Sequence, residues 1–511
     1  MTGRRPEPPE HADVVVVGGG MAGLEIAKEL DLRGAPDVLV LEAGPADDLA
    51  HVNAAHDADT ALRMWLAPDG DPHFWRPWSS HCAPHYLGVA GLRRRLGGRS
   101  LYWHGVTLPV ENWALREPWW PAAVVRDLTR SWQDGPSLLT RVGNDLRDWA
   151  AADGPAPAAG PDTLDLGSVR LVRAPQAVRA VPGPADHRWE AYSPLTHWEQ
   201  GLDSRRTRFA ADTRVLSVRL TEGQVTGVTV RSGPAGAVRT VSCRTVVLAA
   251  GTVESTRIVA QSLGRREPFD GLVDHLAQGF VVALPPDGIP AGIAAAADAG
   301  AFLYAPGPPA ARSNLFVRLY RNRTGAVVLD TWLMGEQLPC ADGVLRFTPD
   351  ADPQAPWTTA VSCGLGPQDT EVVAAQRTAL REFWEQFCLA TGRTATPLGF
   401  PDFESAERIL EDVLPGVDEA SADAVPVTWT RPLGTEYHEA GTLPLGRWLD
   451  DGHALRGTRG LYVAGPASFP RSGAANPSLT VLALARRLAA LLPLGPSEPT
   501  APAAGAREVR P

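Results

Sequence analysis

Apolar runs and glycines near the amino end of the chain predict a buried strand, a tight turn and a helix. Residues 14–17 are four consecutive valines, an uninterrupted β-branched run that is typical of a fully buried strand. Apolar positions then recur with helical spacing from residue 21 to about residue 30, and Gly34 is expected to end that helix. Three glycines at the G-x-G-x-x-G spacing, Gly18, Gly20 and Gly23, follow the strand and continue into the start of the helix.

A second apolar run, at residues 38–41, predicts the next buried strand, and it ends in Glu42. In such a unit the first glycine permits the turn, the second lets the backbone approach a pyrophosphate, and the third lets the helix pack on the sheet. The amino end of the helix then attracts the diphosphate. Glu42 lies 42 − 23 = 19 residues beyond the last glycine, where an acid bonds ribose hydroxyls. The unit therefore predicts an adenine dinucleotide site.

Similar patterns return later in the chain and enclose a different one. They predict a hairpin over residues 213–230, a buried strand and helix over 245–262, a strand at 460–465 and a helix from Asn476. Between residues 279 and 363 alternating apolar runs predict an antiparallel sheet, and a long helix is expected from about 370 to 391. The predicted fold class is α/β (α+β overall), with a discontinuous Rossmann-like domain and an inserted antiparallel-sheet substrate domain.

The expected domain boundaries follow from these patterns. The nucleotide-binding domain is assigned residues 11–130, 205–275 and 432–494, and the substrate-binding domain residues 131–204 and 276–431. Residues 1–10 and 495–511 are expected to be disordered tails, and residues 154–161 a flexible loop. Residues 45–85 show no sustained period and are interpreted as a long excursion that could cover a site.

Composition excludes several classes of partner. The 511 residues have a net charge of −10, and three arginines at 93–95 are the one basic cluster, so nucleic acid is not expected as a partner. No uncharged apolar run is long enough to span a bilayer, and the first strand begins too early for a signal peptide to precede it. The five cysteines show no metal spacing and fit a reducing compartment. We expect a soluble, cytoplasmic protein with no metal and no membrane partner.

Several short motifs follow one another along the chain in a fixed order. After the first glycine motif and Glu42 come the segments 96–100 (Leu-Gly-Gly-Arg-Ser), 247–251 (Val-Leu-Ala-Ala-Gly), 271–275 (Gly-Leu-Val-Asp-His), 437–442 (Tyr-His-Glu-Ala-Gly-Thr) and 461–477. In this order they resemble the glucose-methanol-choline (GMC) flavoprotein oxidoreductases, over residues 13 to about 490. The resemblance implies FAD as the cofactor, bound in a discontinuous Rossmann-like FAD-binding domain, with the sheet of the substrate domain facing the isoalloxazine.

The resemblance also implies which residues contact the cofactor. They are Gly18, Gly20, Met21, Ala22, Gly23, Glu42, Ala43, Gly98, Ser100, Val215, Ala250, Gly251, Gly465, Asn476 and Pro477. Gly465 stands where many members carry aspartate, although the pyranose-oxidase branch also has glycine there. Tyr102 stands where covalent pyranose oxidases carry the flavin-linking histidine. We therefore expect non-covalent, dissociable FAD, with His104 as the alternative attachment point.

The catalytic pair that the resemblance implies is His438 and Asn476, which are 476 − 438 = 38 residues apart. This His/Asn form resembles the pyranose-oxidase and cholesterol-oxidase branches. Neutral imidazole can take the hydroxyl proton near pH 7 while the carbon passes its hydride to flavin N5. The asparagine amide can hold the substrate oxygen without titrating. His104, His197 and His275 are expected to be structural.

The resemblance favours a sugar-like or aminoglycoside substrate whose hydroxymethyl group is oxidised to an aldehyde in antibiotic or secondary-metabolite biosynthesis. Two acids flank His438, namely Glu436 and Glu439, and would attract an amine-bearing molecule. The alternatives are a sterol or other small-alcohol oxidase, an NAD-dependent dehydrogenase that uses the first βαβ unit, and a non-catalytic flavoprotein. Oxygen or another acceptor would reoxidise the flavin, and the sequence determines neither the acceptor nor the oligomeric state.

Overall fold

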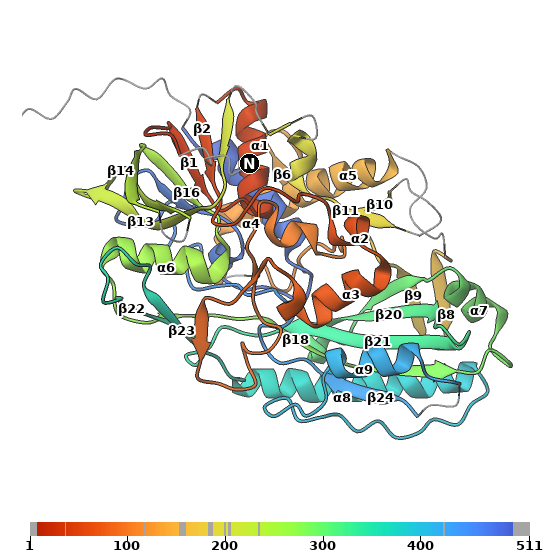
Figure 1. Ribbon diagram of the computed structural model, residues 1–511. Helices are drawn as coiled ribbons and strands as arrows, with labels where there is room; N and C mark the ends of the chain where they lie inside the picture. Colours follow the sequence, from red (N-terminus) through yellow and green to blue (C-terminus); the bar gives the residue numbers. More distant parts are fainter. Residues whose placement is uncertain are drawn as a thin grey trace, which may run out of the picture.

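The molecule has two tiers, a parallel sheet with its helices and a larger antiparallel sheet with helices on both sides (Figure 1). The structure is a computed structural model that describes residues 8–493, except for 36, 117, 153–159, 182–187, 199–200, 203–205, 234–235 and 423–424. The tails expected at 1–10 and 495–511 and the loop expected at 154–161 lie wholly or largely outside the described residues.

The upper tier is a five-stranded parallel sheet whose strands come from distant parts of the sequence. Its order is β12 (Thr207–Ala210), β2 (Val38–Leu41), β1 (Val14–Val17), β16 (Thr245–Leu248) and β25 (Leu461–Val463). The central valines are buried on both faces, as the continuous apolar runs predict. Helix α1 (Met21–Leu32) packs against α10 (Ser478–Leu491). The two ends of the chain therefore build one sheet and its helical cover, as expected.

The lower tier is a seven-stranded antiparallel sheet. Its order is β24 (Val427–Thr430), β18 (His275–Leu284), β21 (Val327–Glu336), β20 (Ser313–Arg321), β19 (Phe302–Pro306), β9 (Val169–Arg173) and β8 (Thr163–Leu166). This confirms the expected mixed fold with an antiparallel block between the segments of the parallel sheet.

The two faces of this sheet have different partners because strand side chains alternate. Leu329 and Leu333 of β21 pack in a core with helix α8 (Pro367–Ala390). Val328 and Met334 point to the other face, where helix α9 (Leu410–Asp418) lies. Figure 1 shows α8 and α9 beside this sheet. The α9 face also borders the cavity described below.

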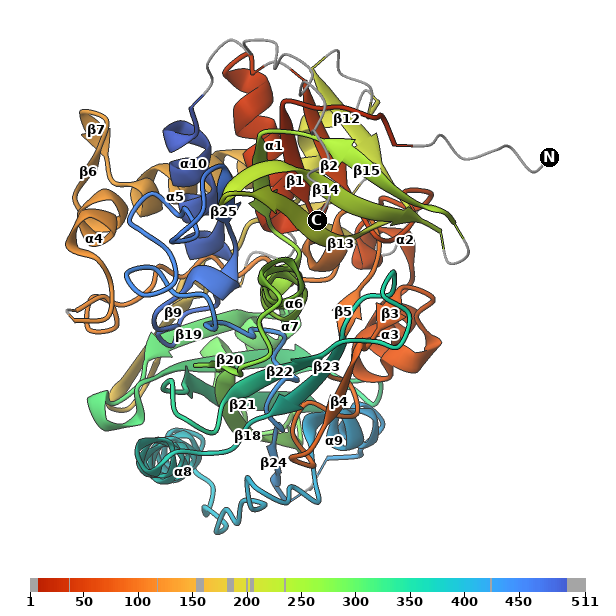
Figure 2. The same ribbon diagram turned by 90° about the vertical axis from the view of Figure 1, so that its left-hand side faces the viewer.

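Smaller sheets and helices surround the two tiers (Figure 2). The smaller sheets are β13 (Thr213–Thr221) with β14 (Gln224–Ser232) and β15 (Val238–Ser242), β17 (Phe269–Asp270) with β22 (Val344–Thr348), β23 (Thr358–Ser362) and β4 (Trp78–Ser80), β10 (Val178–Ala180) with β11 (Trp189–Ala191), β3 (Phe74–Trp75) with β5 (Leu92–Arg93), and β6 (Ser131–Trp132) with β7 (Gly135–Pro136). The further helices are α2 (Val52–Ala55), α3 (Ala58–Leu66), α4 (Ala122–Thr129), α5 (Leu138–Ala151), α6 (Gly251–Leu263) and α7 (Ala291–Asp298), with short 3-10 turns that include η2 (Gly98–Leu101) and η3 (Pro194–Trp198).

Two elements differ from the sequence expectation. Helix α8 begins at Pro367, earlier than expected, because the Asp369 carboxylate accepts the N–H of Gly366 at 2.9 Å and proline suits the first helical turn. Residues 45–85, expected to lack regular structure, contain α2 and α3. The Asp57 carboxylate caps α3 by accepting the N–H of Thr60 at 2.9 Å. Elements this short do not establish a detectable period.

Candidate active site

A cavity of about 680 Å³ is lined by residues of both tiers. It contains nearly all of the residues that the sequence assigns to cofactor and substrate. Those lining it are Gly18, Gly20, Met21, Ala22, Glu42, Ala43, Gly98, Ser100, Val215, Ala250, Gly251, His438, Gly465, Asn476 and Pro477. Folding therefore brings segments that are hundreds of residues apart in the sequence to one site.

The glycines of the first motif have distinct surroundings. Gly18 has a φ of +101°, and a Cβ atom there would lie 2.6 Å from the Ala249 carbonyl oxygen. A Cβ on Gly23 would lie 2.0 Å from the Gly18 carbonyl oxygen, so Gly23 is needed for close packing and does not line the cavity. A Cβ on Gly20 would have no described neighbour within 4 Å. Gly18 therefore permits the turn, and Gly20 leaves open space at the cavity wall, as their assigned roles require.

Three helices begin at this cavity, α1 at Met21, α6 at Gly251 and α10 at Ser478. In the described structure none of the three has a side-chain hydrogen bond at its N-cap, and neither α1 nor α10 has an acidic residue in its first turn. The first N–H groups of a helix carry partial positive charge and favour an anion. The cavity wall therefore suits a diphosphate.

Glu42 lines the cavity at the end of β2, where the sequence places the ribose-binding acid. Its carboxylate accepts the N–H of Gly19 at 2.9 Å and that of Gly44 at 2.7 Å. Burial raises the pKa of Glu42, while these two hydrogen bonds oppose the increase. The side chain is thus held at the glycine turn.

His438 and Asn476 both line the cavity, although they come from a loop after β24 and from the segment before α10. The Oδ1 atom of Asn476 is buried and has no hydrogen-bond partner among the described residues. A buried, unpaired amide oxygen costs free energy unless something else bonds it. Asn476 is therefore poised to bond a molecule in the cavity.

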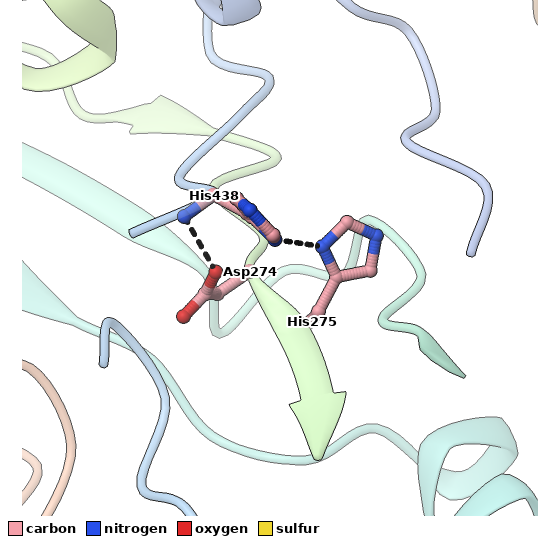
Figure 3. A group of neighbouring side chains, drawn as sticks. All are labelled: Asp274, His275 and His438. Carbon is pink, nitrogen blue, oxygen red and sulfur yellow. Dashed lines mark hydrogen bonds between the residues drawn. The ribbon is translucent and has the colours of Figure 1, made fainter. Parts of the chain in front are cut away.

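His275 contacts the expected base directly, which the sequence interpretation missed (Figure 3). Its Nδ1 atom lies 2.8 Å from Nδ1 of His438, and its Nε2 atom lies 2.9 Å from the Gly473 carbonyl oxygen. Because a carbonyl only accepts, Nε2 of His275 carries the proton and Nδ1 of its neutral ring is an acceptor. His438 then donates its Nδ1–H, which leaves Nε2 of His438 without a proton. The tautomer of His438 is determined by His275.

Both imidazoles are neutral at physiological pH. Burial lowers the pKa of His275 to about 4. Burial also lowers the pKa of His438 to well below its usual value, with further lowering from His275 and from the guanidinium groups of Arg99 and Arg431. A neutral His438 with a free Nε2 lone pair has the form that a general base requires.

Asp274 lies beside the two histidines, and the three could be mistaken for a metal site. Its carboxylate accepts the backbone N–H groups of Gly434, Glu436 and His438, at 2.5, 3.4 and 3.1 Å. Burial and the neighbouring Glu439 and Glu436 raise the pKa of Asp274 to about 7. The Asp274 oxygens bond the backbone of the loop that carries His438, so Asp274 positions His438. The His275 ring is separately bonded at both nitrogens. The Asp274 carboxylate, both His275 nitrogens and Nδ1 of His438 are already hydrogen-bonded, so we assign no metal to this group.

The acids that flank His438 are already paired, which corrects the expectation that they attract a cationic substrate. Glu439 accepts two hydrogen bonds from Arg99, at 2.5 and 2.8 Å. Glu436 lies 2.9 Å from Arg431, which also contacts Glu411 at 2.8 Å. Arginine charge therefore compensates both acids. Arg99 also donates to the Tyr437 carbonyl at 2.8 Å, which ties η2 to the loop that carries His438.

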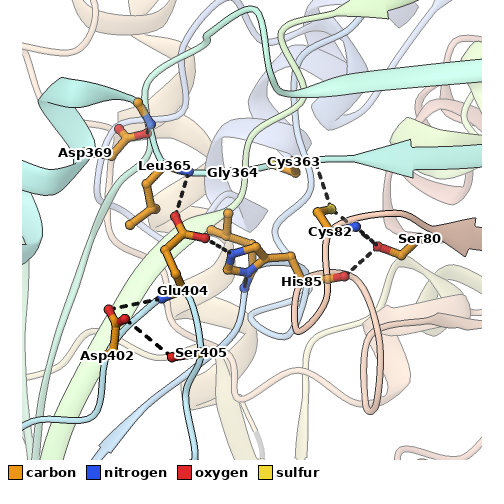
Figure 4. Close-up of polar contacts among 12 residues, drawn as sticks. Ser80, Cys82, His85, Cys363, Gly364, Leu365, Asp369, Asp402, Glu404 and Ser405 are labelled. Carbon is orange, nitrogen blue, oxygen red and sulfur yellow. Dashed lines mark hydrogen bonds and ion pairs between the residues drawn. The ribbon is translucent and has the colours of Figure 1, made fainter.

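A second contact holds the start of the same loop (Figure 4). The Nε2 atom of His85 lies 3.1 Å from the Glu404 carboxylate, and its Nδ1 atom accepts the N–H of Leu433 at 3.2 Å. Tyr86 donates its N–H to the Leu433 carbonyl at 2.7 Å. The excursion at 45–85 and its continuation thus support the loop that carries His438.

Tyr102 and His104, the two positions considered for flavin attachment, both line the cavity. The Tyr102 hydroxyl accepts from Arg95 at 3.4 Å, and burial raises its pKa to about 12. His104 packs edge-on against Trp65, with ring centroids 5.5 Å apart, and burial lowers its pKa to about 3. His197, in contrast, pairs with Asp31 at 3.0 Å and is not part of the cavity lining.

The comparisons with known proteins agree with the geometry of the cavity. Residues 339–485 match the family model described as GMC oxidoreductase. A curated protein, 5-(hydroxymethyl)furfural oxidase of Methylovorus sp. (strain MP688), is 26% identical over 551 residues, which cover 93% of this chain and 98% of the relative.

Solved structures show the same fold at lower identity. Pyridoxine 4-oxidase from Mesorbium loti superposes with a TM-score of 0.58 at 17% identity, covering 94% of this chain and 99% of the other. A formate oxidase superposes with a TM-score of 0.62 at 14% identity, covering 95% and 98%. A formate oxidase variant of Aspergillus oryzae RIB40, solved to show the effect of a mutation on FAD modification, superposes with a TM-score of 0.61 at 14% identity, again covering 95% and 98%. Among the described residues no helix is long and apolar enough to cross a membrane.

Proposed function

From the premise that its domain at residues 339–485 makes this chain a GMC oxidoreductase, we propose that it oxidises the hydroxymethyl group of a sugar-like or aminoglycoside molecule to an aldehyde. The chain is an FAD enzyme that acts on CH–OH groups. The observation that carries the proposal is the neutral His438 with Nε2 unprotonated, in the same cavity as the unpaired oxygen of Asn476.

The residues that line the cavity are of the kinds that bind FAD. Gly18, Gly20 and the amino end of α1 would hold the diphosphate, and Glu42 would hold the ribose. FAD, when bound, supplies the acceptor for the hydride of the alcohol carbon. Because FAD is the cofactor, the NAD-dependent alternative does not hold. Strand β25 belongs to the parallel sheet, and α10 packs against α1 beside it.

His438 and Asn476 supply the acid–base part of the reaction. Nε2 of His438 accepts the hydroxyl proton of the alcohol, which removes the positive charge that would otherwise build on the carbon. The Asn476 amide binds the same oxygen and keeps the alcohol oriented. His275 and Asp274 hold the imidazole and its loop in place.

The cavity lining and the named relative support a polar substrate with a hydroxymethyl group. The part of the cavity at the antiparallel sheet includes charged side chains, Arg318, Asp330, Arg431 and Glu436, which would be desolvated by a sterol. The relative named above is an oxidase of 5-(hydroxymethyl)furfural, whose name contains that group. We therefore place the sugar-like alcohol ahead of the sterol.

The remaining assignments concern the electron acceptor, the cellular location and the partners. The three relatives are named oxidases, which supports oxygen as the acceptor, with hydrogen peroxide as the second product. We propose a cytoplasmic location, which the five unpaired cysteines favour. A small molecule is the expected partner, with no nucleic acid and no membrane.

The proposal is tested by anaerobic mixing. We expect an aminoglycoside pseudodisaccharide to bleach the flavin absorbance of the purified enzyme, a neutral hexose to do so more slowly, and a sterol to have no effect. Bleaching by the sterol alone would overturn the substrate class, and no bleaching by any alcohol would overturn the proposal. Release of hydrogen peroxide in air distinguishes an oxidase from a dehydrogenase.

The role of the base is tested by the variant His438→Ala. We expect it to bind FAD and to reduce it at least about 100-fold more slowly, the usual contribution of a general base. The matched control is His197→Ala, which changes a histidine outside the cavity and should leave the rate of flavin reduction unchanged. A normal rate in His438→Ala would contradict the assignment.

A further inference from the structure

Three aromatic rings form a wall of the cavity on the antiparallel sheet. Phe302 of β19, Phe316 of β20 and Trp332 of β21 stack with ring centroids 5.4 to 5.9 Å apart and planes within 22° of one another. All three line the cavity. Gly279 of β18 makes room for this arrangement, because a Cβ atom there would lie 2.7 Å from atoms of both Trp332 and Trp429.

Asp330 stands in this wall without a partner. It is two residues from Trp332 on β21, so both side chains point to the cavity face of the sheet. The residue is 2% exposed, and its Oδ1 atom is buried with no hydrogen bond to any described residue. Burial raises its pKa to about 6. A carboxylate in such a place is costly unless a ligand compensates its charge.

The neighbouring charges compensate Asp330 only in part, because Arg318 lowers its pKa without forming an ion pair with it. Arg318 lies opposite Asp330 in the β20–β21 register, but its side chain is exposed and lies over Tyr320, 5.7 Å from the ring centroid. Within the described chain no ion pair joins Arg318 to Asp330. Glu436 and Glu439, which the sequence suggested for this role, are paired with arginines. Among the described acids that line the cavity, Glu42, Glu254 and Glu436 are all bonded or paired, so Asp330 is the one that remains available to a ligand.

We propose that Asp330 binds an ammonium group of the substrate, so that this enzyme prefers amino alcohols to neutral alcohols. The inference rests on the proposed alcohol oxidation and specifies its substrate class. An ammonium group satisfies the unpaired Oδ1 with a charge-assisted hydrogen bond, and aromatic faces attract cations. A neutral sugar hydroxyl could bond Asp330 but would leave its charge uncompensated. The chemistry of this wall therefore favours a cation.

The proposal is tested by comparing matched substrates in matched variants. D-glucosamine and D-glucose differ by one ammonium group in place of a hydroxyl, and an aminoglycoside pseudodisaccharide is compared with its N-acetylated form. Binding is measured by calorimetry in the His438→Ala background, in which turnover is blocked, and anaerobic flavin reduction is measured in the otherwise native enzyme. Asp330→Asn removes the charge and keeps the shape, and Arg318→Gln is the control on the opposite strand.

We expect at least one amine to bind about 10- to 100-fold more tightly than its neutral counterpart, the scale of one hydrogen bond to a charged group. Asp330→Asn should abolish that preference, so that the amine and its neutral counterpart bind with similar affinity. Arg318→Gln should preserve or increase the preference, because it removes a nearby positive charge. The inference is overturned if no amine is preferred, or if the preference survives in Asp330→Asn. A preference in binding without any flavin reduction would instead overturn the proposed function alone.

Discussion

At the scale of single residues, the chemistry of this site depends on which nitrogen of His438 carries the proton. The Gly473 carbonyl orients His275, His275 accepts the Nδ1–H of His438, and Nε2 of His438 remains free. Each step uses a group that can only donate or only accept in that position. His275 thus acts through His438 and is a positioning residue.

Replacing His275 tests this chain of hydrogen bonds. His275→Phe keeps the ring but removes the acceptor, so we expect kcat for flavin reduction to fall about 10- to 100-fold with little change in KM, as for other residues that orient a functional group. In His275→Asn the amide oxygen can still accept from His438, so part of the rate should return. Equal rates for the Phe and Asn variants would show that His275 only fills space.

The pH profile of the same enzymes provides a second measurement. A base must be unprotonated, and burial lowers the pKa of His438, so activity should be lost only at low pH. For a neutral alcohol, the acid limb of kcat/KM in the native enzyme should lie below pH 6.5. Because Asp274 holds the His438 loop and has a pKa of about 7, the profile is compared with that of Asp274→Asn. A limb at or above pH 6.5 in both enzymes would contradict the lowered pKa of His438. In His275→Phe the limb should move, because a neighbour that affects the pKa is lost.

At the scale of elements, the site depends on ties between loops from different parts of the chain. Arg99 of η2 joins the segment expected to contact the flavin to the loop of His438 through Glu439 and Tyr437. His85 and Tyr86 hold Leu433 at the start of that loop. The antiparallel sheet contributes a rigid wall beneath both. Positions on loops therefore gain the precision that catalysis requires.

The contribution of the Arg99–Glu439 pair to the stability of the protein can be measured. The Glu439 side chain is 4% exposed and that of Arg99 29%. Arg99→Gln leaves a buried carboxylate without its partner, so we expect a loss of about 3 kcal/mol in the free energy of unfolding. The double variant Arg99→Gln with Glu439→Gln should recover part of this loss, because no unpaired charge remains.

A matched control uses an ion pair at the surface. Arg447→Gln removes the contact between Arg447 and Asp270, whose side chains are 62% and 45% exposed, respectively. It should change the free energy of unfolding by less than about 1 kcal/mol. Thermal and urea unfolding of the FAD-loaded enzyme measure these three variants and the single variant Glu439→Gln. A double variant as unstable as the sum of its two singles would argue against coupling between Arg99 and Glu439.

At the scale of the whole molecule, the cavity lies where the two tiers meet. The parallel sheet combines strands from residues 14–17, 38–41, 207–210, 245–248 and 461–463, and the antiparallel sheet supplies the aromatic wall. FAD bound in this cavity would contact both tiers. The domain boundaries expected from the sequence remain a proposal. They place the junction of the two domains at this cavity.

Cofactor release tests the expected non-covalent binding. The Tyr102 phenol has a raised pKa and stands at the position of the flavin-linking histidine, so we expect no covalent bond to form there. Acid or heat denaturation should release all yellow chromophore through a filter, and added FAD should restore activity to the refolded or apo protein. FAD at about 100 times its dissociation constant should stabilise the fold by about 2.7 kcal/mol. Chromophore that stays with the denatured chain would indicate a covalent link, with His104 to be tested next.

The sequence by itself predicted the elements of this protein and its resemblance to the GMC oxidoreductases. Continuous valine runs, glycine spacing and period-two patterns are local signals, so the parallel strands at the two ends, the antiparallel block and the long helix could be predicted from them. The His438 and Asn476 assignment also came from short motifs, and it remains a prediction that the listed variants test. These features depend on neighbours in sequence or on a motif whose spacing is visible in one chain.

Only the tertiary structure decided what each side chain meets. His275 lies 163 residues from His438 in the sequence, and no pattern in either segment shows that they bond. In the sequence Glu436 and Glu439 look like free acids, but in the fold they pair with Arg431 and Arg99. Asp330 is one position in a largely apolar strand, and only the fold places it unpaired at the cavity. The charge and proton state of a group depend on its surroundings in space, and these arise only when distant segments pack together.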